Sequence, residues 1–273
     1  RPFILRVSTN GPHTPVVPPA PFDTAIAEDA IALPAAAEDL PPGRPAWVGD
    51  WLARAAAASR LSPDQIRAMR RYYYGEAAYL DSLFGGLLEW MRSRGLLVNT
   101  IVALCSDHGT HLGDYGLVQK QSFYAPVLHV PFLLWYPERV AGGRAYDTPV
   151  ESLSLLPTLL DLAGLETPPC DGVSLAPSLV AGVEPAARPV YSEFTLGSFE
   201  MRPDDRLALV REGDWRLSCC LDPEPHDLDL CNMAEDPLER TNLHGAPGAA
   251  EVEARLLERI HEHLRASQEP VSP

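Results

Sequence analysis

The sequence has no apolar run approaching the roughly 18–20 residues that a transmembrane helix requires. It is also poor in positive charge, with 22 Lys and Arg against 37 Asp and Glu, and its net charge is −15. Nucleic acids are bound by clustered lysine and arginine, so this balance argues against them as partners. Hydrophobic residues make up 46% of the chain, which is enough for a sizeable core and excludes wholesale disorder. We therefore expect a folded chain with no membrane span and no nucleic-acid partner.

Cysteine is present, but in no pattern that predicts a disulfide framework or a zinc site. The five cysteines are odd in number and form no C-x-x-C spacing, and no asparagine begins an N-x-S/T glycosylation site. We therefore predict reduced thiols and favour a cytoplasmic location. A periplasmic or secreted location stays open, because the chain begins with a strand-like segment and we expect its numbering to start inside a longer sequence.

Hydrophobic periodicity predicts alternating strands and helices over the first two thirds of the chain. Buried strands are expected at 3–8, 100–106 and 130–136, and helices at 62–95 and 154–163. Nine prolines between Pro12 and Pro45 exclude a helix or a central strand from that stretch. Strands separated by helices predict an α/β fold whose mixed, mainly parallel sheet is sandwiched by helices.

The pattern changes near the C-terminus. Residues 207–221 and 226–232 are typical of antiparallel strands, and 251–264 of an amphipathic helix. We therefore predict two domains: an α/β domain over residues 1–195, and a smaller α+β subdomain with an antiparallel sheet and a helix over 196–273.

Four side chains have the chemistry of an active site. Asp107 and His108 follow a predicted strand, at the sheet end where ligands gather, and a carboxylate beside an imidazole suits a divalent cation. Gly109 would let the backbone approach a ligand closely. A turn in which Asp107 caps the following loop explains the same tripeptide equally well. Lys120 is either an oxyanion-stabilising group or a solvated surface lysine, and His13 is either a reactive imidazole or a loop residue packed among prolines.

The order of these segments resembles the sulfatase family of the alkaline-phosphatase superfamily, nearly from end to end. The resemblance is carried by RPFILRVSTNGPHTPVVPPAPF, by the stretch from YYYGEAAYLDSLFGG to CSDHGTHLGDYGLVQK, by LSLLPTLLDLAGL and by HDLDLCNMAEDPLERTNL. It implies an incomplete alkaline-phosphatase-like fold and a sulfuric ester hydrolase. The Asp-His form is similar to the branch that contains choline and iduronate sulfatases and phosphonate monoester hydrolases.

The resemblance also implies roles for the four candidates. Asp107 and His108 fall on two metal ligands, with calcium the expected metal and manganese the alternative. His13 falls on the histidine that contacts the sulfate or its leaving oxygen, and Lys120 on the lysine that does so from the other side. A histidine can protonate a departing alkoxide, while a metal and a lysine neutralise the sulfuryl charge.

Two features of the family have no counterpart in this chain. The nucleophile is a cysteine or serine in a C/S-x-P/A-x-R context that is oxidised to formylglycine. None of the five cysteines has that context (Cys105, Cys170, Cys219, Cys220 and Cys231). The paired aspartates of the family's first strand are absent as well. We expect both in an N-terminal segment before Arg1, so this chain contains no nucleophile and is expected to be inactive by itself.

Three local departures surround the predicted lysine loop. Tyr115 stands where the family has histidine, and Ala125 and His129 replace an acidic and a basic residue. The resemblance therefore leaves open whether the loop still presents Lys120 to the site.

The favoured function is the C-terminal part of an enzyme that cleaves a small sulfate ester with a divalent metal. A small substrate is favoured because acidic loops such as Asp204-Asp205 do not suit a polyanionic glycan. The alternatives are a catalytically dead truncated chain or pseudoenzyme, and a phosphonate or phosphodiester hydrolase of the same superfamily. Missing strands would leave backbone groups unpaired, so we also expect aggregation or a homo-oligomer through an exposed sheet edge.

Overall fold

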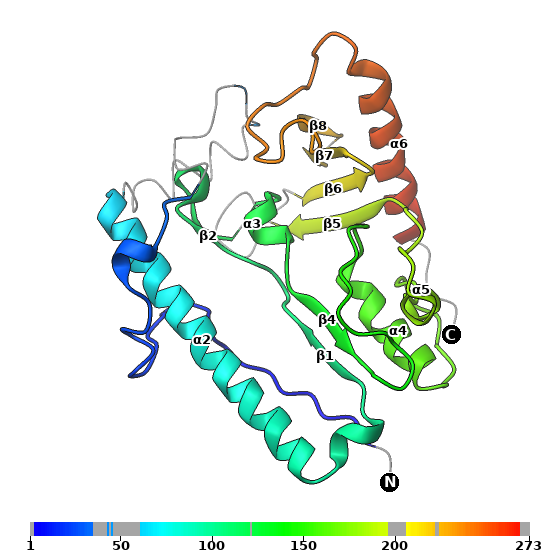
Figure 1. Ribbon diagram of the computed structural model, residues 1–273. Coiled ribbons are helices and arrows are strands. Elements are labelled where there is room, and N and C mark those ends of the chain that lie inside the picture. The colour runs from blue at the N-terminus through cyan, green and yellow to red at the C-terminus, as the bar shows by residue number, and fades with distance from the viewer. Residues whose placement is uncertain are drawn as a thin grey trace.

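The computed structural model describes residues 3–34, 43, 45, 61–120, 122–195, 206–221 and 224–267 (Figure 1). Its α-helices are α2 (Pro63–Ser93), α3 (Ala125–Leu128), α4 (Leu155–Leu162), α5 (Ala176–Ala181) and α6 (Ala250–Ser267). Its strands are β1 (Val102–Cys105), β2 (His111–Leu112), β3 (Val118–Gln119), β4 (Phe132–Trp135), β5 (Val190–Thr195), β6 (Arg206–Glu212), β7 (Trp215–Cys220) and β8 (His226–Asn232). Short 3₁₀ helices cover Glu28–Ala30, Leu96–Asn99, Asp114–Gly116 and Ser152–Ser154.

Helix α2 confirms the strongest local prediction. The Ser62 hydroxyl accepts a hydrogen bond from the Gln65 N–H, and the Gln65 side chain accepts one from the Ser62 N–H, which together form a capping box. Pro63 stands in the first helical turn, where its missing N–H costs nothing. The helix ends at Ser93, and Gly95 follows in the left-handed conformation with φ 66°.

The described strands form three antiparallel sheets: β1–β4, β2–β3 and β5–β6–β7–β8. The α/β class and the C-terminal antiparallel sheet are confirmed. The parallel pairing expected in the main sheet is not found among the described residues. Parallel pairing needs a long crossover connection, whereas the chain between β1 and β4 is taken up by a small hairpin and the single turn of α3.

Two expectations of buried strands are wrong. Residues 3–8 are exposed and pair with no described strand, although in Figure 1 they run beside α2. The β1–β4 sheet is covered only in part: Leu134 packs against a buried cluster, whereas Leu133 and Trp135 of β4 are exposed. A strand is buried only where a neighbour covers it, so apolar composition overstated burial in both places.

The C-terminal sheet is packed on both faces. Ala208 and Val210 of β6 face a core shared with α6, whose Leu256 and Ile260 are fully buried. The alternate residues Leu207 and Leu209 face the opposite way, into a core formed with the chain segment 115–124. The sheet therefore joins α6 to the segment that precedes α3 (Figure 1).

The sheet takes its edge strand β5 from residues 190–195, which the sequence assigned to the first domain. The boundary at residue 195 itself stays a prediction. Asp204-Asp205 lie outside the described residues. None of the five cysteines is in a disulfide. Among the described helices, none is both long and apolar enough to cross a membrane.

Candidate functional site

Strand β1 ends at Cys105 and delivers Asp107 and His108 to the loop beyond it. The Asp107 carboxylate is exposed on 84% of its surface, and its Oδ1 accepts a hydrogen bond from the His108 N–H at 2.9 Å. Burial would raise the pKa of this carboxyl, but that hydrogen bond, the nearby imidazole and the Ser106 hydroxyl together lower the pKa below its usual value. Asp107 is therefore an ionised carboxylate at neutral pH.

The imidazole of His108 is oriented through both ring nitrogens. Its Nδ1 lies 2.8 Å from the Gly109 carbonyl oxygen, which can only accept, so we assign the ring proton to Nδ1. Nε2 then carries a lone pair, and the Lys120 ammonium donates to it at 2.8 Å. Asp107 Oδ2 lies 3.7 Å from the same Nε2. The three side chains thus meet at one point. Their roles as metal ligands and sulfate-binding lysine stay predictions.

A hairpin presents Lys120 to this point. Strands β2 and β3 pair antiparallel, and Lys120 follows β3 directly. The connecting turn needs left-handed backbone at Gly113 (φ 94°) and Tyr115 (φ 58°). The departure at Tyr115 has therefore not moved Lys120 away from His108.

Asp107 and His108 fit one side of a divalent metal site. A carboxylate oxygen and an imidazole nitrogen with a free lone pair point to the same place, and Nδ1 is held by a backbone carbonyl, as in metal-bound histidines. The Lys120 ammonium, itself a cation, already lies against this nitrogen. Two ligands are fewer than a hard cation requires. Within the described residues, no group of three or more His, Cys, Asp or Glu side chains could hold a metal.

Gly109 allows a close approach within the chain itself. A Cβ at this position would lie 2.1 Å from the Pro126 carbonyl oxygen. The Gly109 N–H donates to the Val127 carbonyl oxygen at 2.7 Å. The glycine therefore lets the site loop lie against α3, and its approach to a ligand stays a prediction.

The structure does not bring His13 to the other three candidates. The His13 Nδ1 lies 2.7 Å from the Thr14 carbonyl oxygen, and the side chain is exposed. The surrounding loop packs on the middle of α2, where the rings of Phe22 and Tyr79 lie 5.5 Å apart. Among the described residues, no hydrogen bond or ion pair connects His13 with Asp107, His108 or Lys120.

A buried polar cluster around His111 was not predicted from the sequence. His111 is 1% exposed, and its Nε2 lies 2.7 Å from the Ser122 hydroxyl. Burial lowers its pKa to about 4 against the opposing charge of Asp114, so the ring is neutral at physiological pH. The Tyr115 and Tyr124 rings pack against His111 and against each other. The sequence around His111 carried no signal of its burial, because its chain neighbours follow no apolar pattern and the packing tyrosines come from residues 115 and 124.

A second missed group connects the C-terminal sheet to α3. Arg216 is buried, with Nη2 3.0 Å from Asp229 Oδ2 and Nε 2.8 Å from Glu239 Oε1. Burial acts to lower the pKa of Arg216, but the two carboxylates raise it further above its usual value. The other oxygen of Glu239 accepts the Ala125 N–H at 2.8 Å. Asp229 and Glu239 lie within the segment HDLDLCNMAEDPLERTNL that carries the family resemblance, but nothing in that segment indicated that they pair with Arg216 or that Glu239 contacts Ala125.

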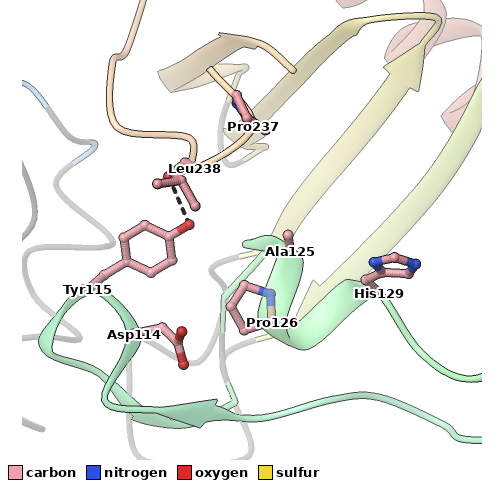
Figure 2. Close-up of a pocket in the computed structure, with 7 residues that line it drawn as sticks. All are labelled: Asp114, Tyr115, Ala125, Pro126, His129, Pro237 and Leu238. Carbon is pink, nitrogen blue, oxygen red and sulfur yellow. Dashed lines mark hydrogen bonds between the residues drawn. The ribbon is translucent and has the colours of Figure 1, made fainter. Parts of the chain in front are cut away.

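A pocket of about 300 Å³ opens beside these contacts. Figure 2 shows its walls, with the Tyr115 hydroxyl donating to the Leu238 carbonyl oxygen at 2.9 Å and the His129 ring turned away from that contact. Its lining residues come from the β2–β3 loop, from α3 and the residue after it, and from the segment before Glu239 (Asp114, Tyr115, Ala125, Pro126, His129, Pro237 and Leu238). The pocket thus lies where the two parts of the chain meet, beside the residues that replace the family's acidic and basic pair.

Comparisons with known proteins show the family of this chain. The sulfatase family model matches residues 1–165, and the family model for the C-terminal region of N-sulphoglucosamine sulphohydrolase matches residues 113–266. A choline-sulfatase of Rhizobium meliloti (strain 1021) is 36% identical over 192 residues, covering 68% of this chain and 35% of the relative. An arylsulfatase K of Xenopus laevis is 30% identical over 190 residues, with the same coverage.

Among solved structures, a phosphonate monoester hydrolase from Silicibacter pomeroyi superposes with a TM-score of 0.80 and 26% identity. The superposition covers 95% of this chain and 55% of that enzyme. The chain thus spans about a third to about a half of the length of these relatives. Each of the two family models covers more than half of the chain, and the solved relative shares its fold. The chain therefore belongs to the sulfatase family of the alkaline-phosphatase superfamily.

Proposed function

We propose that this chain supplies part of the active site of a sulfuric ester hydrolase. The observation that carries the proposal is the meeting of Asp107, His108 and Lys120 within hydrogen-bonding or near-contact distance. Such a group can hold one side of a cation and present a further positive charge beside it. Sulfate esters carry negative charge that must be neutralised as the ester bond breaks.

Each residue has a separate task in this proposal. The Asp107 carboxylate and the His108 Nε2 would hold a divalent metal, calcium in the first place and manganese as the alternative. The metal, when bound, supplies positive charge toward the sulfuryl oxygens. Lys120 would then turn its ammonium from Nε2 to a sulfuryl oxygen and bind the charge that develops there. His13 would act as a general acid toward the departing alkoxide in the assembled protein, where the rest of the polypeptide would have to bring it to the other three side chains.

We infer that the nucleophile lies on a polypeptide segment outside these 273 residues. None of the five cysteines has the context of a formylglycine precursor, and the chain spans only a part of its relatives. The remaining metal ligands would come from the same segment, since the described residues provide two. By itself the chain is then expected to be inactive. A truncated chain or pseudoenzyme is the competing interpretation.

A small sulfate ester is the proposed substrate. One relative is a choline-sulfatase, and the net charge of −15 works against binding a polyanionic glycan. A phosphonate or phosphodiester substrate is the second candidate. It is supported by the phosphonate monoester hydrolase, which superposes on 95% of this chain.

The gene and the complete protein test the proposal. An in-frame segment upstream of Arg1 with paired aspartates and a C-x-P-S-R sequence is expected, and a stop codon there would refute the enzyme. The complete protein should then hydrolyse choline sulfate or an aryl sulfate. Turnover of a phenylphosphonate ester without turnover of any sulfate would establish the second candidate instead. Turnover of a heparan fragment alone would contradict the small substrate.

A further inference from the structure

We propose that Glu239 is a positioning residue that holds α3, and through α3 the Asp107–His108 pair, in place. The proposal rests on the proposed function only for the role of that pair. In this proposal, the C-terminal sheet not only stabilises the fold but also determines the position of the loop that carries Asp107 and His108.

Glu239 uses each carboxylate oxygen for a different partner. Its Oε1 lies 2.8 Å from the Arg216 Nε, and its Oε2 accepts the Ala125 N–H at 2.8 Å. The side chain is 1% exposed. Burying a carboxylate is unfavourable in free energy unless its oxygens are paired, so loss of either contact should destabilise the fold. Glu239 is thereby tied to β7 on one side and to the first residue of α3 on the other.

The backbone at this position is unusual as well. Glu239 has φ 50°, the left-handed region that residues other than glycine seldom adopt. Such conformations persist where the surrounding contacts determine them. The preceding residue, Leu238, accepts the Tyr115 hydroxyl at 2.9 Å (Figure 2). Two consecutive residues of the C-terminal part thus hold α3 and the turn of the lysine hairpin.

Helix α3 connects Glu239 to the site loop. It has only four residues, so its place depends on the contacts at its ends. At its far end the Val127 carbonyl oxygen accepts the Gly109 N–H at 2.7 Å, and the Gly109 carbonyl oxygen in turn contacts the His108 Nδ1 at 2.8 Å. A continuous series of short contacts therefore runs from Glu239 through α3 to the ring of His108.

Asp229 offers a matched comparison. Its carboxylate pairs with the same Arg216 at 3.0 Å and is equally buried, whereas the Ala125 N–H donates to Glu239. If Glu239 serves only to neutralise Arg216, loss of either carboxylate should have the same effect on the site loop. If Glu239 positions α3, the two effects should differ.

The decisive variant is Ala125→Pro, which removes the N–H that Glu239 accepts and leaves the Arg216 pair untouched. Proline is well suited to the first position of a helix. The preceding residue, Tyr124, already has the extended conformation that proline imposes on its neighbour, with φ −80° and ψ 154°. Glu239→Asp is the second variant, because the shorter side chain keeps the charge but cannot reach both partners.

The measurement is amide hydrogen exchange at Gly109, together with the imidazole nitrogen shifts of His108, in the 273-residue chain without metal. Exchange at Gly109, corrected for global stability, should rise by about tenfold in both variants, as expected for the loss of one hydrogen bond to a charged group. The His108 shifts should change with it. In Asp229→Asn, melting should occur at a lower temperature while the corrected exchange at Gly109 stays at the wild-type rate.

Unchanged exchange at Gly109 in Ala125→Pro and Glu239→Asp would overturn the proposal. An equal rise in Asp229→Asn would also overturn it, because the effect would then be one of stability alone. If Ala125→Pro does not fold, Glu239→Asp decides the outcome by itself. The readout needs neither substrate nor turnover, so a failure of the proposed hydrolase function would leave this result standing.

Discussion

Replacing Gly109 by alanine should both destabilise the chain and displace the site. The added Cβ would lie 2.1 Å from the Pro126 carbonyl oxygen, about 1.3 Å short of the 3.4 Å of an ordinary contact. All of its near neighbours are backbone atoms of α3, so no side chain can rotate away. The loop and α3 must separate, and the hydrogen bond from the Gly109 N–H to Val127 must lengthen or break.

The magnitude follows from these two effects. Overpacking of a tight contact costs about 1–3 kcal/mol, and the loss of a hydrogen bond about 0.5–1.5 kcal/mol. We therefore expect Gly109→Ala to lower the free energy of unfolding by about 2–4 kcal/mol, measured by urea denaturation. Because Gly109 adjoins His108, the contact between His108 and Lys120 should change too, which imidazole nitrogen shifts would report.

Two glycines serve as controls. A Cβ added at Gly142 would have no atom within 4 Å, so Gly142→Ala should change the free energy of unfolding by no more than about 0.5 kcal/mol. In Gly172→Ala the Cβ would lie 2.0 Å from the Leu153 carbonyl oxygen, which is as severe a clash but on another part of the chain. It should destabilise similarly and leave the His108 shifts unchanged. Wild-type stability in Gly109→Ala, or altered His108 shifts in Gly172→Ala, would refute the reasoning.

Three further predictions concern turnover, pH and association. In the complete protein, Asp107→Ala should abolish metal binding and turnover. Lys120→Ala should lower kcat by about 10²–10³-fold with little loss of stability. A wild-type kcat in either variant would show that the replaced residue is not part of the active site. The pKa of His111 is about 4 in the folded chain, against the ordinary histidine value of 6.5, so the unfolded chain binds its proton more readily. Stability should therefore fall by up to about 3 kcal/mol as the pH drops from about 6.5 through 4, and urea denaturation of His111→Gln should show a flatter profile. The exposed face of the β1–β4 sheet, and its edges that pair with no described strand, should make the isolated chain associate or aggregate in sedimentation experiments. A monodisperse monomer that melts cooperatively would contradict this.

The local elements of the fold could be predicted because their signals lie within a few residues of each other. Ser62, Pro63 and Gly95 lie at the ends of α2, and the segments 207–221 and 226–232 were typical of the antiparallel strands β6 to β8. What failed was burial: residues 3–8 have the composition of a core strand and are exposed. Burial depends on a second segment that covers the first, and no periodicity within a segment reports whether that cover is present.

For the site, the sequence by itself determined the chemistry, because Asp107 and His108 are neighbours and directly follow a strand. Only the tertiary structure decided the assembly: Lys120 reaches His108 through a hairpin with several left-handed residues, whereas the loop of the exposed His13 packs on α2. It also revealed Glu239, whose partner Ala125 is 114 residues away. Such contacts are set by how the C-terminal sheet packs on the rest of the chain, and the free energy that holds them is shared among residues that no local pattern connects.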